Sequence, residues 1–472
     1  MNKNRLIIII FFSSIFFAKA QKLLISPELD TRNDLTFDLI GKVDQRIIAL
    51  RDKGNKKVVN IYDKNLFRYI EKTLSLEDKK TDLIASVNYK NKFTVFYEVN
   101  YKNTKYIKAK SFNSMGAQLD SININEFNWG FSSKKYNHVV SEDFSKVLLY
   151  RIINNSEIEI TVIDLKTFKK ILDKKTKFTD LRLNFDYRQV EISNKGDIYF
   201  VFEKKASLFN KSGHKFFIKA FYASTGKKKQ KQKTLKFNSS NLKIKYDNKN
   251  NILNITGLIT KLYEVKTIGY YVFQYSEKLN IINGYKNYFK NKFLKEYYKL
   301  ENNKQKKYIR NLKLKNIILR NDGGLVLLLE KIEIIKRRNN SYYSGQQYLY
   351  GDTDYNYESI VIFSIHDTGE EYWSKIIPKN QLSSNDYGIY SSFFAFNTSS
   401  FLNIIFNDEI KNNNQVILYS INPVGAMKRK SIFSTDTYNM NLTVSKAMQI
   451  SASRIIIPSY KKDRLKLVSI NF

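Results

Sequence analysis

Short runs of alternating or continuous apolar residues, separated by compact polar turns, recur along this 472-residue chain. Four of the turns share one form, with an apolar residue four positions before a glycine and mostly small or polar residues between them. They are the segments 112–116, 222–226, 365–369 and 421–425. Each follows an apolar run and precedes a polar one, so each predicts a β-hairpin whose glycine supplies a positive φ.

The apolar runs also repeat at a nearly constant spacing. The centre of the most apolar strand in each unit gives eight markers: Ile48, Val95, Leu148, Tyr199, Leu253, Val326, Ile404 and Ile456. They lie 47 to 54 residues apart, except for intervals of 73 and 78 residues that each contain an insertion. Four short strands and their turns occupy about 50 residues in a propeller blade. We therefore predict an all-β chain folded as a β-propeller. Eight blades are favoured, seven are the alternative, and two packed β-sandwiches are the rival architecture.

The two ends of this repeat predict how the ring closes. The last unit ends with its third strand, at 465–470, and a lone apolar strand lies far upstream, at 22–25. Together they complete one blade. We expect the N-terminal strand to join the C-terminal blade, so that the ring exposes no long strand edge.

The first twenty residues are typical of a secretory signal peptide. A basic start with Lys3 and Arg5 precedes an apolar run at 6–17 and an Ala-Lys-Ala cleavage site at 18–20. The run is shorter than the ~20 residues that span a bilayer. We expect residues 21–472 to form one exported propeller domain, periplasmic rather than extracellular. The chain has no cysteine, so a core and not disulfides must stabilise it.

The first insertion, at about 289–310, has helical spacing. Phe289, Phe293, Tyr297 and Leu300 fall on one face of a helix and lysines on the opposite face. We expect a basic amphipathic helix that packs its aromatic face on the propeller. A helix that docks on a partner or on an anionic membrane surface is the alternative. The candidate contact residues are Lys292, Lys295 and Lys299.

The second insertion, at about 336–358, is rich in tyrosine and carries two glycines. Tyrosine offers a large amphipathic surface at low entropic cost, so we expect a recognition loop for a partner. A loop folded over the adjacent blade is the alternative. The candidate partner-binding residues are Tyr342, Tyr343, Tyr348, Tyr350, Tyr355 and Tyr357.

The same insertion contains a weak metal-binding pattern. Oxygen ligands stand at alternate positions, as at the start of a Ca²⁺ loop. Tyr357 occupies the position of the expected glycine and Phe363 that of the expected glutamate, so the match is incomplete. We expect no cofactor, with Ca²⁺ as the metal to test. The candidate ligands are Asp352, Asp354, Asn356 and Glu358.

The excess of positive charge indicates which kinds of partner the protein could bind. Lys and Arg number 80 against 44 Asp and Glu, a formal net charge of +36. This excess attracts anionic partners, although a chain rich in Lys, Asn, Ile and Tyr also acquires it through composition alone. Basic segments at 227–233, 336–338 and 428–430 predict solvated strands around the rim. Export makes nucleic acid an unsuitable partner.

We find no catalytic motif. The three histidines, His138, His214 and His366, fall in different units, and neither a G-x-S-x-G nor an H-E-x-x-H sequence occurs. We therefore expect a protein that is not an enzyme. A hydrolase or lyase with its site at the mouth of the central funnel is an alternative, and it requires clustered carboxylates from several blades.

Three features carry a family resemblance. They are the 18–20 cleavage site, the Asp-Gly-Gly-Leu turn at 322–325 and the hairpin at 367–373. With them, the chain resembles the exported β-propellers of bacteria that possess type IX secretion. In size and character it is similar to the plug subunit that caps the translocon barrel. This resemblance implies a periplasmic, protein-binding role in transport.

Taken together, the sequence predicts a non-enzymatic propeller that binds a protein of the cell envelope, with an outer-membrane secretion barrel as one such partner. A binding module for acidic polysaccharide, lipopolysaccharide or anionic lipid is the second hypothesis.

Overall fold

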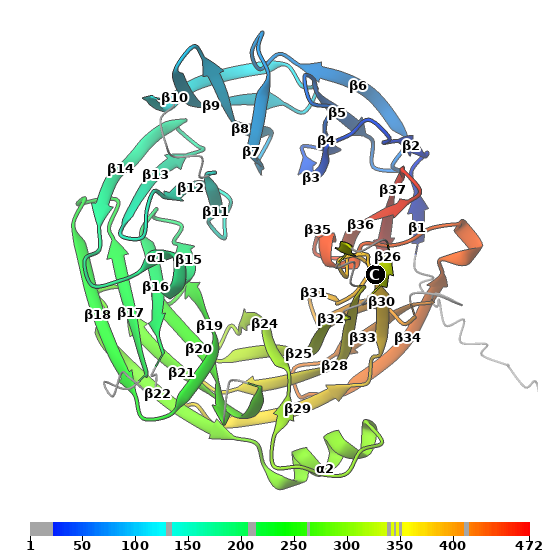
Figure 1. Ribbon diagram of the computed structural model, residues 1–472. Helices are drawn as coiled ribbons and strands as arrows, with labels where there is room; N and C mark the ends of the chain where they lie inside the picture. Colours follow the sequence, from blue (N-terminus) through cyan, green and yellow to red (C-terminus); the bar gives the residue numbers. More distant parts are fainter. Residues whose placement is uncertain are drawn as a thin grey trace, which may run out of the picture.

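The computed structural model describes residues 22–128, 135–205, 214–261, 265–337, 341–343, 346–348, 352–409 and 415–472. The predicted signal peptide lies outside these ranges. Eight antiparallel sheets stand side by side around a central axis, in chain order (Figure 1). The chain is therefore an eight-bladed β-propeller, and the seven-blade and double-sandwich alternatives are wrong. Within the described ranges, no helix has the length and apolar character to cross a membrane.

Each blade has four main strands, numbered from the axis outwards. Blades 1 to 4 are built from β3 (Thr36–Val43), β4 (Arg46–Asp52), β5 (Lys57–Tyr62) and β6 (Arg68–Leu74); β7 (Thr81–Tyr89), β8 (Lys92–Tyr101), β9 (Thr104–Asn113) and β10 (Gln118–Asn128); β11 (Asn137–Val140), β12 (Lys146–Ile152), β13 (Glu157–Asp164) and β14 (Lys169–Lys177); and β15 (Tyr187–Ile192), β16 (Ile198–Lys204), β17 (His214–Phe221) and β18 (Lys228–Leu235).

Blades 5 to 8 follow the same plan with additions. They are built from β19 (Asn238–Asp247), β20 (Ile252–Lys261), β21 (Lys266–Ser276) and β22 (Ile281–Tyr288), with β23 (Ile309–Arg310); β24 (Leu312–Leu319), β25 (Leu325–Lys336), β28 (Thr353–Ile365) and β29 (Glu371–Ile377), with β30 (Gln381–Ser384); β31 (Phe394–Asn397), β32 (Leu402–Asn407), β33 (Gln415–Ile421) and β34 (Met427–Ser434); and β35 (Met448–Ser451), β36 (Arg454–Lys461), β37 (Arg464–Asn471) and β1 (Lys22–Ile25), with β2 (Leu29–Asp30).

The remaining elements are short. They are the hairpin β26 (Ser341–Tyr343) and β27 (Gln346–Tyr348), the helices α1 (Leu183–Asp186) and α2 (Asn291–Leu300), and the 3-10 turns η1 (Asp436–Tyr438) and η2 (Val444–Lys446).

The predicted pattern of burial is confirmed. All eight sequence markers lie in the second strand of a blade and are buried, because neighbouring blades cover both faces of that strand. The outer strands are polar: β18 is exposed over most of its length. The core is divided into clusters between adjacent blades, such as the one that joins Leu148 of blade 3 to Phe200 of blade 4.

The four predicted glycine turns are confirmed as well. Gly116, Gly226, Gly369 and Gly425 have φ of +71°, +63°, +91° and +84° and connect the third strand of a blade to its outer strand. Blade 1 has no glycine at this turn. There Leu66 adopts a φ of +67° while its side chain is buried.

The ring closes as predicted from the two chain ends. β1 pairs with β37 from Lys22 opposite Asn471 to Ile25 opposite Val468. β2 then pairs with the start of β37. The outer strand of blade 8 thus comes from the N-terminal end of the described chain, which next passes into blade 1 (Figure 1).

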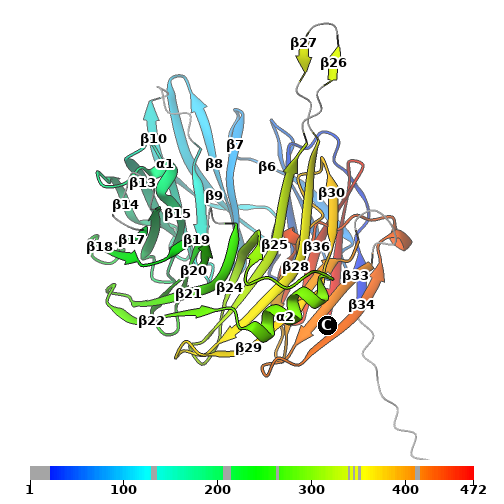
Figure 2. The same cartoon turned by 60° about the horizontal axis from the view of Figure 1, so that its bottom comes forward.

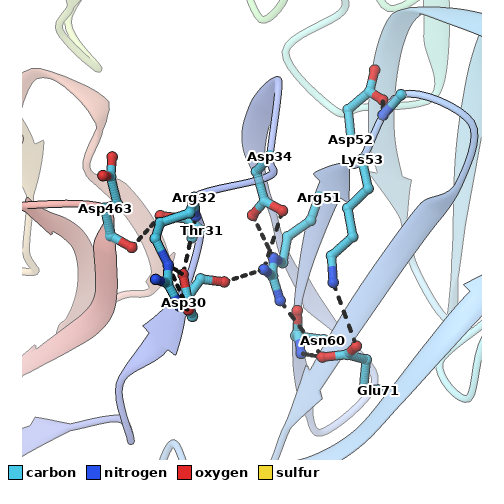
Figure 3. Close-up of polar contacts among 11 residues, drawn as sticks. Asp30, Thr31, Arg32, Asp34, Arg51, Asp52, Lys53, Asn60, Glu71 and Asp463 are labelled. Carbon is cyan, nitrogen blue, oxygen red and sulfur yellow. Dashed lines mark hydrogen bonds and ion pairs between the residues drawn. The ribbon is translucent and has the colours of Figure 1, made fainter.

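A buried ion pair fixes this crossing from blade 8 to blade 1 (Figure 3). The Arg51 Nε atom lies 2.6 Å from Asp34 Oδ2, and both side chains are shielded from solvent. The same guanidinium donates to the backbone oxygen of Asp30 and lies 3.5 Å from Glu71. The Thr31 N–H and hydroxyl both donate to the Asp463 carbonyl, at 2.9 and 2.8 Å. Arg51 on β4 therefore holds the segment that links the first blade to the last.

We expect Asp34→Ala to lower the free energy of unfolding by roughly 3 kcal/mol, because it removes the main counter-charge from a buried guanidinium. Urea unfolding measures this loss. Asp30→Ala is the matched control, because the Asp30–Arg32 pair lies in the same segment but is exposed and its loss is expected to be much smaller. Equal losses in the two variants would contradict this role of Arg51.

Candidate functional site

The candidate site is an extension of blade 6. β25 and β28 pair from Leu325 opposite Ile365 to Lys336 opposite Thr353, with a bulge between Glu330 and Ile332. Residues 325–330 of β25 and 360–365 of β28 belong to the blade, and the other ends of both strands extend beyond it. We call residues 332–336 and 353–357, with β26 and β27, the arm. Figure 2 shows the arm rising above one face of the disc.

A third strand widens the base of the arm. β30 pairs with β28 from Tyr357 opposite Gln381 to Asp354 opposite Ser384. On the other side, β24 pairs with β25 only as far as Leu312 opposite Lys331. Within the described part of the chain, residues 333–336 therefore have a strand partner on one side only.

The arm and its neighbouring loop expose large apolar side chains. Ile334 is 54% exposed, Ile335 41%, Leu382 50% and Tyr387 84%. Successive residues of a strand point to opposite faces, so Ile334 and Ile335 place apolar surface on both faces of the arm. By the strand register, Ile335 and Leu382 share one face.

The tyrosine-rich insertion was predicted as a loop, and that prediction is wrong for most of its length. Tyr342 and Tyr343 lie on β26 and Tyr348 lies on β27, whereas Tyr350 lies outside the described residues. Tyr355 and Tyr357 are half-buried on β28. Within the described residues of the insertion, β26 pairs with β27, and the outer parts of β25 and β28 pair with each other as far as Lys336 opposite Thr353. The five predicted tyrosines that the structure describes therefore all lie on strands of the arm.

A buried charge cluster anchors the base of the arm. Lys379 Nζ lies 2.9 Å from Glu330 Oε1, and both side chains are fully buried. Lys379 also donates to the Tyr357 carbonyl at 3.0 Å and to Gln381 Oε1 at 2.9 Å. The Ser392 hydroxyl donates to Glu330 Oε2 at 2.7 Å. Burial lowers the pKa of Lys379, while the Glu330 carboxylate acts in the opposite direction. The cluster joins β25, β28, β30 and the chain that enters blade 7.

A cavity of about 660 Å³ lies beside this cluster. Its charged lining residues are Glu301, Lys331, Glu358, Lys379, Asp408 and Glu409. Lys331 forms an ion pair with Glu358, and its Nζ atom lies 3.4 Å from Glu301 Oε2. Asp408 forms an ion pair with Arg429 at 3.0 Å. Burial raises the pKa of the Glu358 carboxyl, against the effect of Lys331. Most of these carboxylates are held in ion pairs, which suits a structural role.

The candidate metal ligands are not gathered around a common point. Asp354, Asn356 and Glu358 lie along the extended strand β28 rather than in a loop. Asp354 pairs with Arg337 and Asp352 accepts a hydrogen bond from Asn385 at 2.8 Å. Among the residues that the structure describes, no group of three or more His, Cys, Asp or Glu side chains could hold a metal ion.

The predicted amphipathic helix is confirmed as α2, with its aromatic face packed on blade 6. The Phe293 ring lies against Phe363 in a tilted arrangement, with ring centroids 5.1 Å apart. The predicted apolar face was partly wrong: Leu300 is exposed, and Leu294 and Tyr298 are buried instead. The buried pairs at 293–294 and 297–298 define the face that points to the blade. The other face carries the exposed candidates Lys292, Lys295 and Lys299.

Sequence reasoning missed the apolar residues of the arm and the anchor beneath it. The run from 325 to 335 stays mostly apolar beyond the usual length of a blade strand, and this signal could have identified Ile334 and Ile335. No sequence signal pairs Glu330 with Lys379, because they meet only when β30 folds back on β28.

No protein-family model and no curated protein matches the chain. Similar solved structures include the WD40 domain of SCAP from fission yeast, with 9% identity and a TM-score of 0.44, covering 96% of this chain and 98% of that one. The β-propeller domain of the Trilobed protease from Pyrococcus furiosus has 10% identity and a TM-score of 0.39, covering 85% and 96%. The polysaccharide lyase Uly1 has 10% identity and a TM-score of 0.40, covering 82% and 89%. At these identities the similarity concerns the fold alone.

We expect Lys379→Met to lower the free energy of unfolding by roughly 3 kcal/mol, because it leaves the Glu330 carboxylate buried without its closest cation. Adding Glu330→Gln removes that charge, so the double variant is expected to regain part of the loss. Urea unfolding of the two variants and the parent measures both effects. A double variant less stable than Lys379→Met would contradict this account of the anchor.

Proposed function

We propose that this protein is a non-enzymatic binding propeller whose arm docks on a protein of the cell envelope. The observation that carries the proposal is the arm itself. The outer parts of β25 and β28 extend beyond the disc and expose isoleucines on both faces, and β26 and β27 carry three of the predicted tyrosines. Exposed apolar patches with aromatic residues are typical of protein interfaces.

The geometry of the arm favours a particular mode of binding. A strand that is paired on one side can accept a further strand on the other, and backbone hydrogen bonds then supply affinity while side-chain contacts supply specificity. Residues 333–336 of β25 offer such an edge. Ile334 and Ile335 within it would contact the partner on either face of the added strand.

The predicted signal peptide and the type IX resemblance both support a partner in the cell envelope. We infer a periplasmic location and a role in transport, with an outer-membrane secretion barrel as the favoured partner. The exposed lysines of α2 add a cationic surface on the rim, where an acidic segment of the partner could lie. The ion-paired carboxylates of the cavity below the arm favour this binding role over the hydrolase or lyase alternative.

We expect two changes to the arm to abolish partner capture without unfolding the ring. In one variant an Asn-Gly turn replaces residues 337–352, which keeps the Lys336–Thr353 pair and closes the hairpin early. In the other, Ile334→Asp and Ile335→Asp remove the exposed apolar surface. Crosslinked pull-down from intact envelopes, read by quantitative mass spectrometry, measures the loss.

The matched control is Ile281→Asp with Ile282→Asp. These isoleucines are also consecutive and exposed, but they lie on β22, the outer strand of blade 5. One envelope protein should be captured by the parent and the control and reduced at least tenfold with both arm variants. Equal capture by all four proteins would refute the proposal, as would the absence of any protein captured in stoichiometric amount.

A further inference from the structure

A second surface, on a different part of the disc, has the chemistry of a ligand groove. The groove lies between blades 7 and 8 and has a volume of about 630 Å³. Its walls come from the turn between β31 and β32, from β33 and β34, and from the turn between β35 and β36. The residues that matter here are Phe401, Asn403, Ser420, Lys428 and Lys430.

The polar floor of the groove is fixed by hydrogen bonds. Asn403 is only 3% exposed. Its Nδ2 atom donates to the Thr398 hydroxyl at 3.1 Å, and its Oδ1 atom accepts from the Ser420 hydroxyl at 2.7 Å. The amide therefore holds two hydroxyl groups in place along the groove. Hydroxyls arranged in this way can exchange hydrogen bonds with the hydroxyls of a sugar.

Two lysines line the groove without a counter-charge. Lys428 lies opposite Ser420 and Lys430 opposite Leu418 in the β33–β34 pair, so both share the face that looks toward blade 8. Arg429 also lines the groove, but in the strand register it lies on the other face of the pair, and its guanidinium pairs with Asp408 at 3.0 Å. Within the described ranges, the side chains of Lys428 and Lys430 form neither a hydrogen bond nor an ion pair. Among the described residues that line the groove, none is Asp or Glu.

An exposed aromatic ring, that of Phe401, also lines the groove. Phe401 is 39% exposed in a tight turn, which the hydrogen bond from Thr398 N–H to the Phe401 carbonyl closes at 2.9 Å. The apolar face of a pyranose ring packs well on such a ring, which is large, apolar and held in place. The groove therefore combines three groups from blade 7: an aromatic ring, two fixed hydroxyl groups and two lysines without an ion-pair partner among the described residues.

We propose that this groove binds an acidic oligosaccharide. The Phe401 ring would pack against one sugar, Ser420 and Thr398 would bond its hydroxyls, and Lys428 and Lys430 would pair with its anionic groups. Uronate carboxylates, sulfate esters and phosphate esters share this anionic chemistry. The site uses residues separate from the arm, so protein binding and glycan binding can succeed or fail independently.

The test is isothermal titration calorimetry on the parent protein at about 0.15 M salt, where long-range attraction is screened. The probes are oligosaccharides of galacturonate, of sulfated heparin type and of phosphorylated mannan, with neutral dextran of the same length. Binding of an acidic probe but not of dextran is expected. Comparing the three acidic probes identifies the anionic group.

The variants separate a specific site from general attraction by a protein of charge +36. Lys428→Glu with Lys430→Glu should weaken binding at least about tenfold. Lys169→Glu with Lys175→Glu, on the outer strand β14 of blade 3, makes the same charge change and should have little effect. Phe401→Ala should weaken binding without changing its salt dependence, whereas Phe67→Ala, at another exposed phenylalanine, should not weaken it.

Equal losses in the two lysine pairs would overturn the proposal, because only net charge would then matter. Equal binding of dextran, or no binding of any acidic probe, would overturn it as well. None of these results bears on capture of a protein by the arm, so the two proposals fail separately.

Discussion

The pairing of β1 with β37 is the interaction on which the rest of the structure depends. The second strand of every blade is apolar on both faces and is stable only when a neighbour lies on each side. Blades 8 and 1 become neighbours because the N-terminal strand completes blade 8 and the chain then enters blade 1. The cluster that contains Leu29, Ile47 and Ile456 lies across this junction, and the Arg51–Asp34 pair fixes the connecting segment. With the ring closed, no long edge remains at the junction.

A closed ring also gives the two proposed binding surfaces a rigid base. The described base of the arm continues two strands of blade 6, and the Glu330–Lys379 pair ties it to the start of blade 7. The groove between blades 7 and 8 likewise depends on two adjacent blades that cannot move apart. Both proposals therefore place function on additions and surface residues of a repeated scaffold, as is general for such folds.

The repeat made the fold predictable. Eight apolar markers at similar spacing gave the blades, and four glycines gave turns that have positive φ in the structure. The arm was harder to predict because its tyrosines and glycines resemble a loop, although Ile332, Ile334 and Ile335 continue the apolar run of the blade strand. The position of α2 was predictable from its 3.6-residue period, but the choice of Leu294 and Tyr298 over Leu300 depends on the shape of the blade beneath. Phe401 and Lys428 line the same groove only because the strands of blade 7 pair. The sequence alone does not show that these two residues lie on one surface.

The central claim is that the arm contacts a protein of the envelope, and site-specific photocrosslinking in intact cells tests it most directly. A photoreactive amino acid would replace Ile334 in one protein and Ile282, on the outer strand of blade 5, in another. We expect one discrete adduct with an envelope protein from position 334 and none from position 282. No adduct from position 334, or the same adducts from both positions, would contradict the account.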